Sequence, residues 1–185
     1  MRPVLLPAVV AAVAVLIAGC SGGDEAQPAA PGSDPAQVAT SMIETTMAAR
    51  LDIGPLNAGC NDPGPLAVGA SFTCAATTET GNPVDVVAAV AGDGHLQLTT
   101  TNVIRADALP GFEREAASML NQSEGTNFTA EAVDCGDATV VLGDDMVLAC
   151  GLAMPVSGDV YDLTLTITNI DLRHFALAVA PQARP

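Results

Sequence analysis

The chain contains no lysine and no tryptophan, and it has one tyrosine and four phenylalanines in 185 residues. Six arginines face 21 acidic residues, so the formal net charge is −15. A surface with this charge repels phosphate, which argues against nucleic acid as a partner and against docking on anionic lipid. We therefore expect no nucleic-acid partner.

Motifs of catalysis are also missing. The sequence has no Gly-x-Ser-x-Gly elbow, no phosphate-binding loop and no zinc-protease helix motif. No nucleophile, base and orienting group can be placed together. We therefore expect a protein that is not an enzyme, with no catalytic residue and no cofactor.

Candidate metal ligands are few. His95 and His174 each follow a predicted turn. A shared metal or pH-sensing role is one interpretation, and a polar residue that opens an edge strand is the one that we prefer. Five acidic residues of the second half could bind calcium weakly: Asp144, Asp145, Asp159, Asp162 and Asp171. They lack the ligand spacing and the glycine of a calcium-binding loop. We expect no metal site.

The chain also lacks an apolar run long enough to cross a bilayer. The longest run, Val4 to Ala18, has 15 apolar or small residues and would span roughly 22 Å as a helix, less than the ~30 Å hydrocarbon core. With Arg2 before it, this run is typical of a signal peptide. It ends in Leu16-Ile17-Ala18-Gly19-Cys20, which has the form of a lipobox.

The lipobox predicts where the protein resides. Residues 1–19 would be a lipoprotein signal peptide, and the thiol of Cys20 would carry a diacylglyceryl group. The two acyl chains of this group would hold the protein stably on a bilayer. The predicted location is the outer face of the cytoplasmic membrane. An ordinary cleaved signal and an uncleaved anchor are the alternatives. Residues 20–33 are polar and rich in Pro and Gly, which predicts a flexible tether.

The first folded segment begins with a helix. Asp34 is a candidate N-cap, Pro35 suits the first turn and Gln37 occupies the capping-box position. One apolar face follows, before Gly54-Pro55 ends the helix: Val38, Met42, Ile43, Met47 and Leu51. Residues 71–78, 84–91 and 95–99 predict strands joined by turns.

The same order of landmark residues occurs twice, at an offset that grows from 75 to 79 residues, as expected for a duplicated module with small turn insertions. The pairs are Pro35 and Pro110, Cys60 and Cys135, Cys74 and Cys150, Gly81 and Gly158, and His95 and His174. We predict an α+β fold of two tandem repeats, residues 34–106 and 107–182. Each repeat would pack one helix on a three- or four-stranded antiparallel sheet.

Five cysteines minus Cys20 leave an even number, which in an exported chain favours two disulfides. The repeat predicts the pairs Cys60–Cys74 and Cys135–Cys150. Each would close a loop of about 15 residues and stabilise the fold by roughly 3 kcal/mol. Pairing between the repeats and a zinc site made of all four thiolates remain as alternatives.

The first repeat resembles a known family. Cys60-Asn61-Asp62-Pro63, followed by Gly69-Ala70-Ser71-Phe72-Thr73-Cys74, a glycine turn and an alternating strand, resembles a two-cysteine domain of unknown function common in actinobacterial, mycobacterial-type cell-envelope lipoproteins. The resemblance covers residues 35–104. The second repeat departs from it, because Cys135-Gly136-Asp137 has no proline. The resemblance implies an exported α+β module and assigns no chemistry.

Two classes of function remain. The first is a lipid-anchored envelope lipoprotein with a non-catalytic role, which binds a wall component, an envelope protein or a small hydrophobic ligand. The second is a secreted inhibitor, because the layout is similar to that of the β-lactamase inhibitory proteins. The scarcity of aromatic residues weakens the second class, since inhibitor hot spots are rich in Trp, Tyr and Arg. Clustered aromatics on an exposed sheet would favour it.

Overall fold

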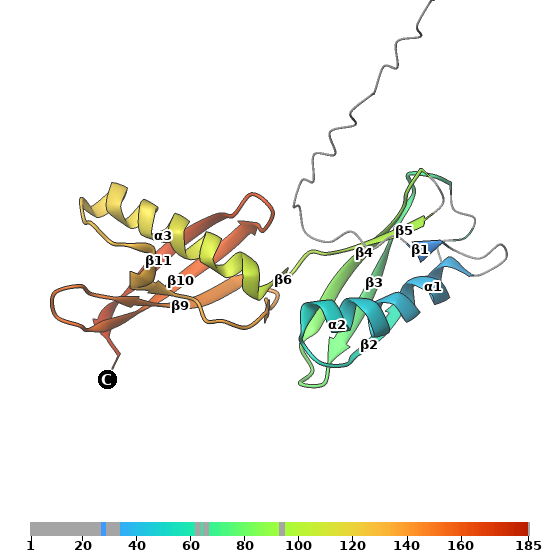
Figure 1. The fold of residues 1–185 in the computed structure, drawn as a ribbon, viewed down its shortest axis with the longest axis horizontal. Helices are drawn as coiled ribbons and strands as arrows, with labels where there is room; N and C mark the ends of the chain where they lie inside the picture. Colours follow the sequence, from blue (N-terminus) through green and yellow to red (C-terminus); the bar gives the residue numbers. More distant parts are fainter. Residues whose placement is uncertain (1–26, 29–33, 62–63, 65–66, 93–94, 185) are drawn as a thin grey trace, which may run out of the picture.

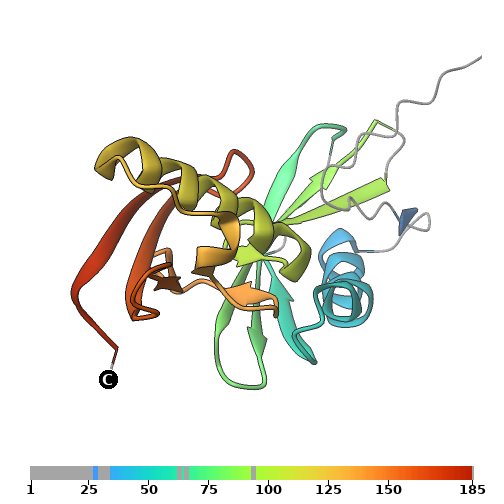
Figure 2. The same ribbon diagram turned by 60° about the vertical axis from the view of Figure 1, so that its left-hand side comes forward.

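A computed structural model describes residues 27–28, 34–61, 64, 67–92 and 95–184. Cys20, the predicted signal peptide and most of the predicted tether lie outside the described residues. The described chain is an α+β protein of antiparallel sheets, with helices packed on them (Figure 1). Figure 2, turned by 60°, shows one helical layer on each of the two larger sheets.

The first half of the chain forms a five-stranded sheet. Its strand order is β1-β5-β4-β3-β2, and every neighbouring pair is antiparallel. The strands are β1 (Gln27–Pro28), β2 (Leu56–Cys60), β3 (Ser71–Thr78), β4 (Pro83–Val90) and β5 (His95–Thr100). Exposed and buried residues alternate strictly along β3, so one face of the sheet is covered and the other faces solvent.

One continuous helical segment covers this sheet, from α1 (Pro35–Met42) through the π-helical η1 (Ile43–Met47) to α2 (Ala48–Leu51). Asp34 caps it as predicted, because its Oδ1 accepts a hydrogen bond of 3.0 Å from the Ala36 amide. The predicted apolar face contributes to the first core, with four of its members buried and Val38 partly buried. The helix therefore forms for the reason that the sequence suggested.

The second half repeats this layering with different proportions. The sheet has the order β11-β10-β9-β7, built from β7 (Val133–Asp134), β9 (Val147–Ala153), β10 (Val160–Asn169) and β11 (His174–Ala183). The helix α3 (Leu109–Glu124) packs on it and ends at Gly125, whose φ of 63° suits glycine. Short 3₁₀ turns lie at η2 (Ala106–Ala108) and η3 (Ala130–Ala132).

A short ribbon joins the halves. The strands β6 (Val103–Ile104) and β8 (Val140–Val141) pair antiparallel. Val103 packs in the first hydrophobic core and Ile104 in the second, because successive side chains of a strand point to opposite sides. The boundary between the two cores therefore falls between these two residues.

Both predicted disulfides are present. Cys60 and Cys74 are direct partners in the register of β2 and β3. Cys135 and Cys150 lie one position beyond the pairing of β7 with β9. Each bridge joins an edge strand of its sheet to the neighbouring strand, so the pairing within each half is confirmed.

The edge strands that carry these bridges also bond to the helices above them. Oε1 of Glu44, in η1, accepts a hydrogen bond of 3.1 Å from the Ala58 amide of β2. Oε1 of Glu113, in α3, accepts one of 3.0 Å from the Cys135 amide. Each glutamate satisfies an amide near an edge strand that would otherwise be available for pairing with another chain.

The predicted number of strands in the first sheet was wrong. The first sheet has five strands rather than three or four, because β2 begins directly after the helix and β1 lies within the segment expected to be a tether. The two halves share a helix, an antiparallel sheet and a disulfide, whereas their sheets differ in the number and order of strands.

Candidate functional site

A cavity of about 230 Å³ lies where the two halves meet. Its walls come from the C-terminal end of the first helical segment, β5, the β6 region, the start of α3 and the turn between β10 and β11. The lining residues are Met47, Arg50, Leu51, Leu98, Thr99, Thr100, Val103, Ile104, Arg105, Ala108, Phe112, Ile170, Asp171 and Arg173.

The apolar part of this lining belongs to the two cores. Leu51, Leu98 and Val103 are members of the first core, and Ile104 and Phe112 are members of the second. All five are at most 6% exposed. Both halves therefore contribute apolar residues to the lining of the cavity, and the cavity depends on how the halves are placed.

The charged part of the lining is cationic. Three of the chain's six arginines line the cavity, Arg50, Arg105 and Arg173, together with one acid, Asp171. The formal charge of the lining is therefore +3 − 1 = +2, whereas that of the whole chain is −15. Cationic charge is concentrated at the place where the two halves meet.

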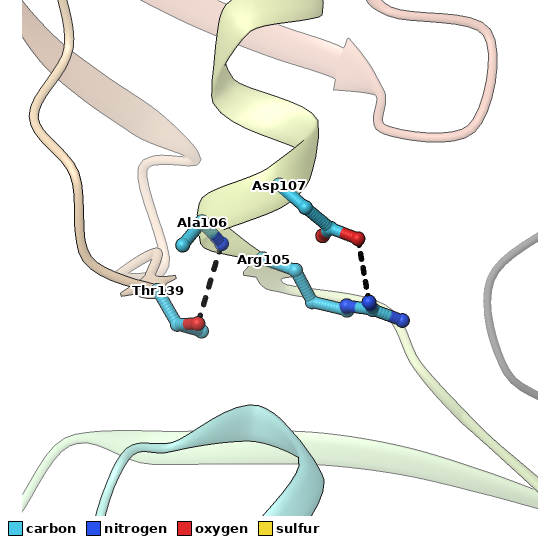
Figure 3. Close-up of polar contacts among 4 residues, drawn as sticks. All are labelled: Arg105, Ala106, Asp107 and Thr139. Carbon is cyan, nitrogen blue, oxygen red and sulfur yellow. Dashed lines mark hydrogen bonds and ion pairs between the residues drawn. The ribbon is translucent and has the colours of Figure 1, made fainter.

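Arg105 lies at the start of the turn that leads into α3. Its Nη2 donates to Oδ2 of Asp107 at 2.6 Å, and the neighbouring Ala106 amide donates to Oγ1 of Thr139 at 3.3 Å (Figure 3). The side chain of Arg105 is 42% exposed. The Thr139 contact ties this turn to the loop before β8, next to the residue that carries the guanidinium.

Arg173 occupies an unfavourable backbone conformation. It ends the turn between β10 and β11 with a φ of 52°, in the left-handed region that glycine and asparagine prefer. The turn is closed by the Arg173 amide, which donates to the Ile170 carbonyl at 3.1 Å, and by the Leu172 amide, which donates to Oδ1 of Asn169 at 2.8 Å. This conformation brings the arginine side chain to Gly111.

Gly111 allows the close approach of that side chain. A Cβ atom at this position, in the first turn of α3, would lie 2.5 Å from Nε of Arg173 and 3.0 Å from its Cζ. Any larger residue would therefore displace the guanidinium. The side chain of Arg173 lies directly over the beginning of the helix because Gly111 has no side chain.

A second hollow lies between α1 and β2, and its character differs. It is lined by Asp34, Glu44, Cys60 and neighbouring polar residues of α1, and it opens widely to solvent. Glu44 already accepts the Ala58 amide there. This hollow has neither an apolar floor nor a cation, so we place the candidate site at the junction cavity.

The structure does not bring the histidines together in one sheet. His95 opens β5 in the first sheet and His174 opens β11 in the second. Within the described ranges, no group of three or more His, Cys, Asp or Glu side chains is placed to hold a metal ion. Of the acidic residues considered for calcium, Asp162 pairs with Nε of Arg184 at 2.5 Å and Asp171 lines the cavity.

One carboxyl group that lies outside the cavity has a shifted pKa. A hydrogen bond from the Thr129 side chain, and then one from the Glu131 backbone amide, lower the pKa of Glu131. Glu131 lies in η3 and does not line the cavity. Among the described residues that line it, there is no His, Cys, Ser or Lys, so the arrangement offers groups that bind anions rather than a nucleophile with its base.

The aromatic side chains are occupied in packing. Phe72 is buried in the first core, while Phe112 and Phe175 are buried in the second with ring centroids 5.9 Å apart. Phe128 and Tyr161 pack against the second core. These five are all the aromatic residues of the chain, so no aromatic cluster is displayed on an open sheet face of the kind that an inhibitor-like surface needs.

The junction residues were missed in the sequence. Arg50, Arg105 and Arg173 are 55 and 68 residues apart along the chain, and no spacing rule connects them. The signal that the sequence does offer is the small number of cationic residues, six against 21 acidic ones. Their convergence, however, depends on how the two halves pack.

Comparison of the chain with protein-family models, with curated proteins and with solved structures found no match. In the part of the chain that the structure covers, no helix has both the length and the apolar character needed to cross a membrane. Proposals about function therefore depend on the sequence and on the geometry of this chain.

Proposed function

We propose that this protein is an envelope lipoprotein, anchored through Cys20 to the outer face of the cytoplasmic membrane, with a non-catalytic binding role. The observation that carries the proposal is the pair of disulfides, Cys60–Cys74 and Cys135–Cys150. Disulfides of this structural kind form and persist in oxidising compartments. A signal-peptide-like run that ends in a lipobox with its cysteine at Cys20 supports the lipid anchor.

The junction cavity supports the binding role. A small-molecule site is usually concave and mostly apolar, with a few polar groups that orient the ligand. The apolar floor and the three arginines fit that description. We further propose that the two halves arose by duplication of one module of the two-cysteine envelope type, and that the cavity arose where the copies met.

The anchor is tested by intact-mass analysis of the protein purified from membranes of a lipoprotein-processing bacterium. We expect a mass that corresponds to cleavage before Cys20 plus a diacylglyceryl group, and recovery in the membrane fraction. The Cys20→Ser variant should lack the added mass, and a lipid-anchored form should no longer be recovered. An unmodified Cys20 thiol on the exported, mature protein would refute the anchor.

The binding role is tested by capture from envelope extract with the acylated protein and with the unacylated chain from residue 21 onward. We expect the same partner or ligand with both forms, because the described fold lies entirely outside the anchor. A molecule retained only by the acylated form would be a membrane contaminant. Nothing retained by either form would contradict the binding role.

A further inference from the structure

The junction cavity has the features of a site for one chemical class of ligand. We propose that it binds a small amphiphile, in which a carboxylate or phosphate group is attached to a short apolar chain. The proposal deepens the binding role above and rests on it for its biological setting. Its chemistry depends on four features of the cavity: charge, donor geometry, local backbone cost and size.

The charge of the cavity selects an anion. Arg50, Arg105 and Arg173 come from three different elements and converge on one hollow of a chain whose formal charge is −15. Asp171 is the acid among the lining residues, and Asp107 pairs with Arg105 from outside the lining. The lining residues themselves carry a formal charge of +3 − 1 = +2.

The donor groups suit a carboxylate or a phosphate. A guanidinium is planar and carries five N–H donors, which match the two oxygens of a carboxylate or the oxygens of a phosphate. Arg105 uses Nη2 for Asp107, and Figure 3 shows its other terminal nitrogen directed away from that carboxylate. The Arg105–Asp107 pair thus holds one guanidinium in place and leaves it further donors.

Arg173 and Gly111 each carry a cost in conformational free energy, and together they place a guanidinium at this cavity. Arg173 adopts left-handed backbone dihedrals, which cost roughly 1–2 kcal/mol for a residue with a Cβ atom. Gly111 stands in the first turn of α3, and glycine is a poorer helix former than alanine, by up to about 1 kcal/mol. The result of both choices is a guanidinium on the cavity wall, over the first turn of α3. Backbone strain of this kind is concentrated at functional sites.

The floor and the volume set the rest of the ligand. The apolar lining comes from both halves and includes Met47 and Leu98 of the first half and the partly buried Ile170 of the second. The volume of the cavity is about 230 Å³. This is below the range of drug-sized sites, so the cavity suits a chain of about eight carbons with one anionic end.

Octanoate is the probe for this site. The chain from residue 21 onward contains every described residue, and export behind a cleavable leader lets both disulfides form. In isothermal titration we expect saturable one-to-one binding of octanoate and of octyl phosphate. Inorganic phosphate and octanol should each bind at least about tenfold more weakly, because each supplies only half of the contacts.

The arms of this titration separate the sources of the anion and the contributions to binding. Preference for octanoate over octyl phosphate would identify a fatty-acid type of ligand, and the reverse preference a phosphorylated lipid type; either result supports the site. Octanol that binds as tightly as octanoate would show an apolar pocket without anion recognition and would overturn the proposal. Absence of saturable binding of both octanoate and octyl phosphate would overturn it as well.

Three variants test the role of Arg173 in ligand binding. Arg173→Gly removes the guanidinium and relieves the left-handed strain, so octanoate affinity should fall about tenfold or more while the melting temperature rises. Gly111→Ala keeps every charge but displaces the guanidinium, so affinity should fall although the net charge is unchanged. Arg114→Ala makes the same charge change as Arg173→Gly, at an exposed position of α3 outside the cavity, and should leave affinity unchanged.

The variants also have outcomes that would contradict a role for Arg173. Equal losses in Arg114→Ala and Arg173→Gly would show nonspecific attraction to charge rather than a site. Unchanged affinity in both Arg173→Gly and Gly111→Ala would remove Arg173 from the site. Because the titration uses a chain without a lipid, failure to bind octanoate would leave the Cys20 anchor untouched, and a failure of the anchor test would leave the cavity untouched.

Discussion

Asn102 fixes the junction between the two halves through a single buried side chain. Its Nδ2 donates to the Pro83 carbonyl at 2.9 Å and to the Leu142 carbonyl at 3.0 Å, while its Oδ1 accepts from the Asp85 amide at 2.9 Å. The Leu142 amide in turn donates to the Asn102 carbonyl at 2.8 Å. The residue is 5% exposed, so it links β4 of the first sheet to the loop after β8 where water is excluded.

Replacing Asn102 should therefore be costly. In Asn102→Ala, two carbonyls and one amide lose their partner, and buried polar groups left unsatisfied cost roughly 1–3 kcal/mol each before relaxation and entry of water reduce the total. We expect a loss of about 2–3 kcal/mol in the free energy of unfolding, measured by urea titration.

The matched control is Asn57→Ala, since Asn57 is exposed on β2. This variant should change the free energy of unfolding by less than about 0.5 kcal/mol. If Asn102→Ala is no more destabilising than Asn57→Ala, the side chain of Asn102 does not hold the junction.

For single residues, the sequence predicted the cysteine pairs, but it did not predict which polar residues are buried or which backbones are left-handed. The cysteine pairing followed from the similar offsets between Cys60 and Cys135 and between Cys74 and Cys150, because a duplicated module is expected to pair its cysteines in the same way in each copy. Asn102 looked like any polar residue after a strand, since burial is a property of what packs around it. The backbone dihedrals of Arg173 were equally hidden, because arginine gives no signal for a left-handed turn.

Among the elements, those with a clear period were predicted best. The helical segment from Pro35 to Leu51 follows an apolar face, and β3, along which exposed and buried residues alternate, matches the strand predicted at residues 71–78. The strand β2 was missed because it contains Ala58 and Gly59 and has no alternation to mark it. The strands β6 and β8 have two residues each, which is too short for a periodic signal. Their pairing depends on tertiary contacts.

The N-terminus of the first helical segment offers a test of a local signal. In Asp34→Ala, the Ala36 amide loses the carboxylate that caps it. We expect the free energy of unfolding to fall by about 1 kcal/mol, because Ala is a poor N-cap. The effect is measured by urea titration of the chain from residue 21 onward.

Asparagine caps helices about as well as aspartate does. Asp34→Asn should therefore keep most of the stability while removing the charge, and it serves as the control. A loss in Asp34→Asn as large as that in Asp34→Ala would attribute the effect to charge rather than to the hydrogen bond at Ala36.

The described part of the molecule contains two hydrophobic cores that meet along one short seam. The boundary runs between Val103 and Ile104, and the contacts that cross it include the β6–β8 ribbon and the bonds of Asn102. The sequence predicted two α+β halves, but not how they meet, because the seam is formed by residues that belong to no repeated pattern. The cavity and its arginines lie on that seam, which is why the candidate site could not be read from the sequence.

This arrangement predicts that each disulfide stabilises mainly its own half. In the double variant Cys135→Ala/Cys150→Ala, amide hydrogen exchange in β9 and β10 should accelerate by up to about 100-fold, which corresponds to the roughly 3 kcal/mol expected of a loop of this size. Amides of β3 and β4, in the other core, should accelerate by less than about tenfold, because only the seam transmits the change. The double variant Cys60→Ala/Cys74→Ala should give the reverse pattern under the same conditions. Equal acceleration in both sheets in either variant would mean that the chain opens as one cooperative unit, and the seam would then be a tighter coupling than its few bonds suggest.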